Sequence, residues 1–213
     1  MTTRKSILVS LAITLVVLVS GLLRLANMPE MVPTHWDANG NINGWSPKAF
    51  AVWFMPGIML LFTGLLVVLP KMSPKAYDPL DFILTFNQLW VITIGMMGFI
   101  QVVTLQAAID PKFDSGKWII VGIMLGFALI GNLMGKVRQN HWMGIRVPWT
   151  LSNREVWDQT HRMAGRLWVV SGVVCSLMVL VGLPIWLAFT LFMISTVWPI
   201  FSSYFLWKRL ENH

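Results

Sequence analysis

The sequence predicts an all-α integral membrane protein with six transmembrane helices, and three observations support this class. Its 213 residues are 56% hydrophobic and 12% charged, a composition that soluble domains do not have. Several apolar runs are each about 20 residues long, the length at which a helix crosses a bilayer. The basic residues lie in short polar segments beside those runs. We therefore interpret the net charge of +7 as a topology signal, and we expect no direct contact with nucleic acid.

The first apolar run follows a short basic head and covers residues 6–26. A secretory signal has an apolar core of only about 7–15 residues, followed by a cleavage site flanked by small residues. This run is longer and lacks such a site, so we predict a retained first helix. Arg24, near its end, is expected to extend its guanidinium to the membrane surface.

Five further apolar runs predict five further spans, which brings the total to six. The last two are separated only by Gly182, Leu183 and Pro184, so we expect those two helices to form an antiparallel hairpin. The five spans are predicted at residues 50–69, 83–108, 118–135, 163–182 and 185–206.

Small and polar residues inside the spans indicate helix packing rather than transport. The fourth span carries two pairs of glycines at a spacing of four, Gly122 with Gly126 and Gly131 with Gly135. Such pairs let helices approach closely; we expect packing within the chain, with a homodimer seam as the alternative. The spans contain amides but no Asp, Glu, Lys or His at a predicted midplane. Pumps and ion channels usually carry such groups, so their absence argues against a pump and against an ion channel.

The basic residues also predict the orientation, with both termini in the cytoplasm (N-in and C-in). In this arrangement twelve of the sixteen Lys and Arg residues lie inside. Cytoplasmic loops carry an excess of basic residues, so the reverse orientation is disfavoured. The four basic residues left outside are Arg24, Lys48, Lys112 and Lys117.

The loop at residues 27–49 is predicted to form a small extracytoplasmic cap. Asn39-Gly40 and Asn43-Gly44 are turn-forming pairs, because Gly accepts a positive φ and Asn tolerates it. We therefore expect an ordered hairpin or a cluster of turns on the membrane surface.

Within this loop, His35 and Asp37 flank Trp36. Two candidate ligands without a third are a weak signal for a metal or for acid–base chemistry. The loop also lacks the Gly and Glu positions of an EF-hand, which argues against calcium. We expect structural hydrogen bonds or a partner contact here, and we predict no metal and no cofactor.

The longest polar interval, residues 131–172, holds six of the sixteen basic residues and is predicted to be a basic cytoplasmic segment. Ser152 and Glu155 form a capping-box pattern, so a helix should begin near Asn153 and run without a break into the fifth span. Its basic and acidic residues recur every four positions along one helical face, which we interpret either as a solvated charge stripe or as a dock for an anion or a protein. These residues are Arg154, Asp158, Arg162 and Arg166.

Just before that helix, Pro148 is expected to keep the chain extended and Trp149 to lie at the membrane interface. A guanidinium binds phosphate or carboxylate through two parallel hydrogen bonds, so Arg146 is suited to an anionic lipid headgroup or an acidic peptide. His141 and His161 have no neighbouring Cys and no H-E-x-x-H pattern, so no metal is assigned to them.

Two parts of the chain resemble a known family. The runs GNLMGKVRQN and GIRVPWTLSNREVWDQTHRMAGRLW, with the trailing VSG, are similar to the signature of the SdpI family of bacterial toxin-immunity membrane proteins. The segment MPEMVPTHWDANGNINGWSPK resembles the small domain of unknown function that often precedes this signature. Runs of this length are far more specific than a four-residue motif.

The resemblance implies an N-terminal membrane region, residues 1–130, that contains the outer loop. It also implies a signature region, residues 131–213, that contains the last two helices. The positions that carry the signature, whose individual roles stay open, are Asn140, Gly144, Arg146, Pro148, Trp149, Glu155, Trp157, His161 and Gly165.

The resemblance further implies a multi-pass protein of the bacterial cytoplasmic membrane that protects the cell against a secreted peptide toxin. In some members this protection is combined with sensing of the toxin and recruitment of a transcriptional repressor. We expect the toxin to contact His35, Trp36 and Asp37, because a secreted peptide arrives from outside.

Two other functional classes stay open. A membrane enzyme acting on lipid or peptide would need Glu155, His161 and Arg146 to converge on one pocket. A small-molecule transporter would need a broken helix around a cavity at the midplane. We rank the immunity protein first, then the enzyme and then the transporter, and we assign no catalytic residue.

Overall fold

The structure is a computed structural model that describes residues 1–72 and 79–211. Within those residues, six helices are long and apolar enough to cross a membrane, which agrees with the predicted number. Each predicted span lies largely within one helix. The six are α1 (Thr3–Arg24), α2 (Lys48–Val68), α3 (Pro79–Ile109), α4 (Ser115–Met134), α6 (Arg154–Leu180) and α7 (Ile185–Glu211).

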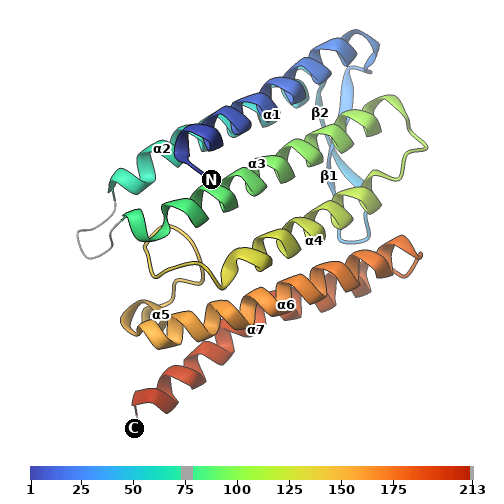
Figure 1. Cartoon of the computed structure of the whole chain (residues 1–213). Coiled ribbons are helices and arrows are strands. Elements are labelled where there is room, and N and C mark those ends of the chain that lie inside the picture. Colours follow the sequence, from blue (N-terminus) through green and yellow to red (C-terminus); the bar gives the residue numbers. More distant parts are fainter. Residues whose placement is uncertain (73–78, 212–213) are drawn as a thin grey trace.

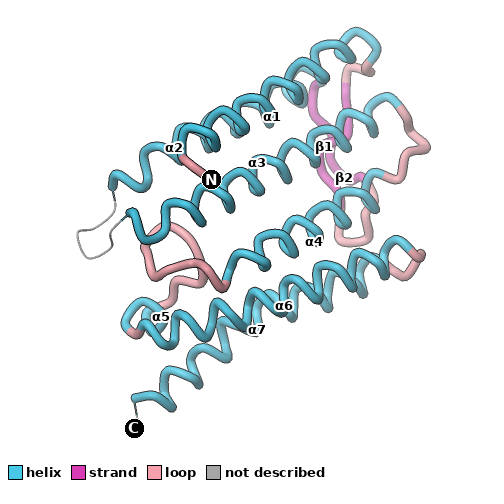
Figure 2. Tube along the Cα trace, in the orientation of Figure 1, coloured by secondary structure: helices cyan, strands magenta, loops and turns pink. Residues whose placement is uncertain are grey.

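The helices run side by side and divide the molecule into two groups (Figure 1). The first group is α1, α2 and α3, the second is α4, α6 and α7, and α3 packs against α4 to join them. Figure 2 shows both termini at the end of the bundle where α4 connects to α6, which we call the terminal end. The opposite end carries the strands, and we call it the hairpin end.

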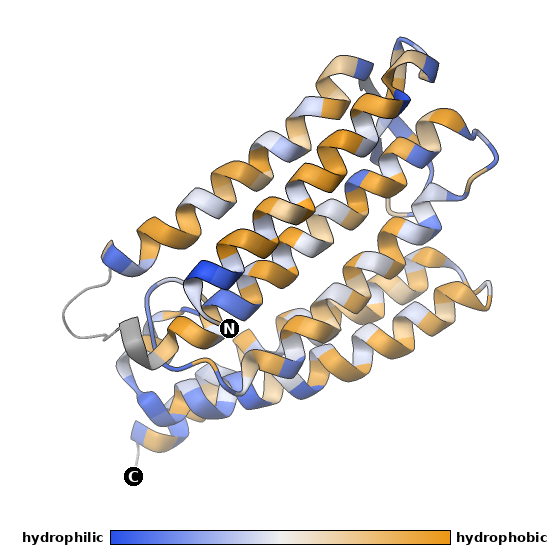
Figure 3. Ribbon diagram, turned by 45° about the horizontal axis from the view of Figure 1, so that its top comes forward, coloured by the Kyte–Doolittle hydropathy of each residue, from blue (hydrophilic) through white to orange (hydrophobic). Residues whose placement is uncertain are grey.

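Hydropathy follows this arrangement. In Figure 3 the helices are apolar along most of their length, and hydrophilic residues gather at the two ends. An apolar band between polar ends is the surface that a lipid bilayer requires. Which end of the bundle faces the cytoplasm stays a prediction. Lys75, one of the twelve basic residues predicted to be cytoplasmic, is not among the described residues.

Glycines set the close contact between α4 and α6. A Cβ added to Gly165 would lie only 2.7 Å from the carbonyl oxygen of Gly131, so neither position admits a side chain without displacing a helix. On the other face of α4, a Cβ at Gly122 or Gly126 would collide with α3, at Phe99 and Met96. The glycines of α4 therefore serve packing within the chain, as expected.

The predicted outer loop forms an antiparallel hairpin of β1 (Met31–Trp36) and β2 (Ile42–Pro47). Its turn contains Gly40, whose φ of 83° favours glycine, so the Asn39-Gly40 prediction is confirmed. The prediction of a turn at Asn43-Gly44 is wrong, because Gly44 lies inside β2 and pairs with His35. There a Cβ would lie 2.8 Å from the Cβ of His35, so close approach of the strands explains the glycine.

The tip of the hairpin rests on the start of α4. A Cβ added to Gly116 would lie 2.0 Å from the carbonyl oxygen of Gly40, so the two backbones touch. Lys48 and Glu30 form an ion pair of 2.8 Å beside the base of the hairpin. The hairpin is thus fixed at both its base and its tip.

Helix α6 begins where the sequence predicts and continues as one rod of 27 residues. The predicted cap is wrong by one residue. Asn153 is the N-cap, and its side-chain oxygen accepts hydrogen bonds from the backbone N–H groups of Glu155 and Val156. Ser152 instead ends the short helix α5 (Pro148–Ser152), where its hydroxyl donates to the carbonyl of Trp149.

Candidate functional site

The signature residues gather in and around the connection between α4 and α6, residues 135–153, which we call the signature loop. Asn140 is fully buried at its centre. Its amide donates to the carbonyl of Arg138 at 2.7 Å, and its oxygen accepts from the backbone N–H groups of Trp142 and Met143 at 2.7 and 2.9 Å. The amide also donates to the carbonyl of Met143 at 3.3 Å. One side chain thus satisfies four backbone groups and closes a tight turn, which an aspartate could not do because it lacks the N–H donors.

A buried histidine joins this loop to α6. The Nε2 atom of His161 accepts a hydrogen bond from the backbone N–H of Ile145 at 3.0 Å. The hydrogen of the neutral ring therefore sits on Nδ1, which donates to the carbonyl of Trp157 at 2.8 Å. Both ring nitrogens are occupied, so His161 offers neither a metal ligand nor a free base in this conformation.

Gly144 lets the loop reach that histidine. Its φ is 104°, and a Cβ there would lie 2.3 Å from the Nε2 atom of His161. The ring of Trp157 stacks on that of His161 with centroids 4.0 Å apart, and its indole N–H donates to the carbonyl of Val137 at 2.7 Å. Through Trp157 and His161, α6 therefore holds the loop near its start, at Val137, and at its middle, at Gly144.

Helix α5 fastens the loop to α7. The indole N–H of Trp149 donates to the hydroxyl of Ser203 at 2.7 Å, and Pro148 occupies the first turn of the helix, where a backbone N–H is not needed. Sequence reasoning missed two further residues here. Thr150, fully buried, donates to the carbonyl of Ile145, and Gln139 donates to the carbonyls at the end of α5.

The two charged signature residues outside the buried core of the loop lie on the surface. Arg146 is exposed and donates to the carbonyl of His141, while exposed Glu155 accepts from the amide of Gln159 at 3.0 Å. With His161 buried, the three candidate groups for an enzyme have separate environments and separate partners. Arg146 and Glu155 are the exposed signature residues that carry charge, and a partner molecule can reach both.

A second candidate site lies at the hairpin end. A cavity of about 410 Å³ is bounded by the hairpin and by α2, α3 and α4, and we call it the hairpin crevice. His35, Trp36 and Asp37 all contribute to its lining, so the structure brings the three predicted contact residues to one cavity. The walls are mostly apolar and include Phe54 of α2 and Ile119 of α4.

Hydrogen bonds hold the polar residues of this crevice in place. Asp37 accepts from the backbone N–H groups of Asn41 and Asn39, and these bonds, above all the one from Asn41, hold the pKa of its carboxyl below the ordinary value. His35 bonds to the side chain of Asn43 through Nδ1. At the floor, Gln101 of α3 is buried and donates to the carbonyl of Ala51 at 2.7 Å.

The fold and these sites define a multi-pass membrane protein with a partly open apolar crevice at one end and an ordered basic loop at the other. Comparison with known proteins specifies it further. The SdpI/YfhL protein family matches residues 136–203, and a domain of unknown function, DUF1648, matches residues 12–60. Over residues 136–203 the chain is thus similar to the SdpI family, and with its six membrane-spanning helices it is a multi-pass protein of the bacterial cytoplasmic membrane.

The similarity extends beyond the two matched regions. The chain is 27% identical over 212 residues to "Immunity protein SdpI" of Bacillus subtilis (strain 168). The aligned region covers 98% of this chain and 99% of that protein. No solved structure matches the chain. The first matched region covers the signature loop from residue 136 onward, and the second contains the hairpin.

Proposed function

We propose that this protein is a membrane immunity protein that protects a bacterium against a secreted peptide toxin. The observation that carries the proposal is the similarity to an immunity protein over nearly the whole of both chains. Since the alignment includes both the hairpin and the signature loop, both sites belong to the function that we propose.

We assign toxin contact to the hairpin crevice. Its volume of about 410 Å³ lies within the range of ligand pockets, about 300–1,000 Å³. A peptide that attacks membranes carries an apolar face and a polar face. The apolar walls suit the first of these faces, and the exposed imidazole of His35 and the carboxylate of Asp37 at the hairpin suit the second.

This assignment includes an orientation, with the hairpin end outside and the terminal end in the cytoplasm. The terminal end carries the basic residues of the signature loop and of the last turn of α7, as the positive-inside rule requires of the cytoplasmic face. There the exposed side chains of Arg146 and Glu155 are suited to a cytoplasmic partner, and the family resemblance favours a transcriptional repressor.

A killing assay tests the proposed function. Sensitive cells expressing this protein are exposed to candidate secreted peptide toxins, with the Bacillus subtilis immunity protein SdpI expressed in parallel as a positive control. We expect survival to rise against at least one toxin. Equal killing with and without the protein, for every toxin that the control resists and at matched membrane levels, would overturn the proposal.

A further inference from the structure

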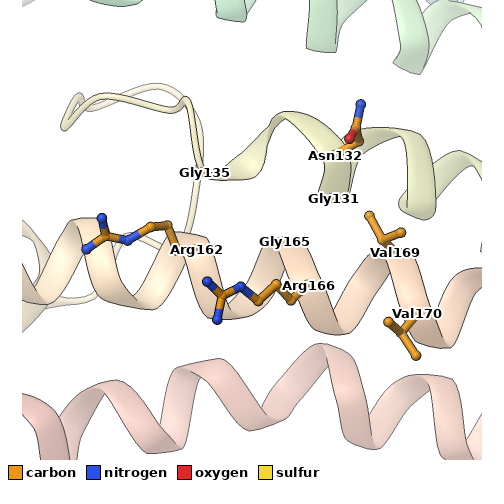
Figure 4. A pocket seen from close by; sticks show the side chains of 8 residues that line it. All are labelled: Gly131, Asn132, Gly135, Arg162, Gly165, Arg166, Val169 and Val170. Atoms are coloured by element: carbon orange, nitrogen blue, oxygen red, sulfur yellow. The ribbon is translucent and has the colours of Figure 1, made fainter.

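A second cavity, of about 400 Å³, lies between the last turns of α4 and the first half of α6. Figure 4 shows it with the side chains of Arg162 and Arg166 along one flank and those of Val169 and Val170 further along α6. We call it the arginine groove. The proposed function assigns it no role.

Glycines make this groove. Gly131 and Gly165 bring the two backbones together, and Gly135 ends α4 without a side chain. A side chain at any of these positions would project into the helix contact or the groove. The result is a channel with a backbone floor, a charged half and an apolar half.

The two arginines carry unbalanced charge. Both are exposed, and among the described residues neither makes an ion pair or a side-chain hydrogen bond. They stand four residues apart on one helix, where like charges repel. In Figure 4 both guanidinium groups extend in the same direction, toward the start of α6. An anion placed beside them would relieve the repulsion and satisfy their N–H donors.

The depth of Arg162 and Arg166 in the membrane indicates which class of anion can reach them. About 20 helical residues cross the hydrocarbon core, and α6 has 27. Counting back from Leu180 puts the hydrocarbon boundary near His161, so Arg162 lies at the boundary and Arg166 one turn inside it. Long arginine side chains in such positions extend their charge to the headgroup layer. The valines that continue the groove then lie at the depth of the acyl chains.

We propose that the arginine groove binds an anionic phospholipid, with its phosphate held by Arg162 and Arg166 and an acyl chain along Val169 and Val170. The charged half of the groove matches the headgroup, and the apolar half matches the chain. The lipid would lie in the groove beside the contact between α4 and α6.

Native mass spectrometry of the full-length protein in detergent tests this site. The protein is titrated with phosphatidylglycerol, phosphatidylcholine or inorganic phosphate, and the lipid bound per protein is measured. The site variant is Arg162→Gln/Arg166→Gln. The matched control is Arg138→Gln/Arg154→Gln, which removes the same charge from exposed arginines at the same end of the bundle. Arg162→Lys/Arg166→Lys keeps both positive charges. It therefore shows whether a loss of lipid binding comes from the lost charge or from misfolding.

We expect one tightly bound phosphatidylglycerol, with phosphatidylcholine binding more weakly. The site variant should bind phosphatidylglycerol at least about tenfold more weakly, because each lost cation near the headgroup weakens binding about fivefold. The control and the lysine variant should retain most of the affinity. Equal binding of the two lipids, an equal loss in the control, or competition by inorganic phosphate at concentrations comparable to the lipid would each overturn the proposal.

Discussion

The indole nitrogen of Trp36, in the hairpin, donates a hydrogen bond of 2.8 Å to the hydroxyl of Ser115 at the start of α4. The two residues are 79 positions apart in the chain. Ser115 is 3% exposed, so the bond is shielded from water. It makes one side of the hairpin crevice a fixed part of the bundle, and it gives Trp36 a structural role beside the toxin contact that we propose.

The two roles of Trp36 can be separated by substitution. Ser115→Ala removes the hydroxyl that accepts this hydrogen bond, and it leaves the residues that line the crevice unchanged. We expect it to lower the free energy of unfolding by about 1 kcal/mol and to leave protection intact. Trp36→Ala should abolish protection at an equal membrane level. Survival in the killing assay and thermal unfolding in detergent measure the two effects. If Ser115→Ala removes protection as fully as Trp36→Ala, the toxin contact at Trp36 is refuted.

Arg146→Ala tests the division of labour between the two ends. Arg146 is exposed in the signature loop, so we expect this variant to bind toxin normally and to lose protection or signalling. The comparison requires a purified-protein binding assay beside the killing assay. Arg138→Ala, another exposed arginine of the same loop, is the control and should behave as the wild type. Loss of toxin binding in Arg146→Ala, with normal binding in Trp36→Ala, would reverse the assignment.

Gly144→Ala should destabilise the protein by about 2 kcal/mol or more, since it adds strain at a positive φ and a collision with His161. The control is Gly57→Ala in α2, where an added Cβ meets no atom within 4 Å. Tryptophan fluorescence during thermal unfolding in detergent reports the difference. Similar midpoints for the two variants would show that the loop does not depend on the contact between Gly144 and His161.

Cysteine labelling tests the orientation. The single native Cys175 is buried, so Cys175→Ala provides the background. In intact cells a membrane-impermeant reagent should label Asn41→Cys at the hairpin end, and should label Arg138→Cys in the signature loop only after permeabilisation. Both positions are exposed, so access across the membrane decides the result. The opposite pattern would place the hairpin in the cytoplasm and remove the basis for toxin contact there.

The length and hydropathy of each segment were enough to predict the six helices, because an apolar run of about 20 residues is a local property that needs no knowledge of its neighbours. The unbroken start of α6 was also predicted from a local property, because no Pro or Gly lies between Asn153 and Met163. Its cap was misplaced by one residue, because Ser152 and Asn153 are both good caps and backbone geometry at the end of α5 decides between them.

The roles of the signature residues were decided only by the tertiary structure. Asn140, Trp157 and His161 have polar side chains that the sequence also allows on a surface, yet all three are buried and bonded to backbone groups of the loop and α6. The arginine groove likewise exists only because Gly131 and Gly165 bring α4 and α6 into contact. Such features depend on which helices pack together, and the free energy of that packing is distributed over residues far apart in the chain, where no local pattern records it.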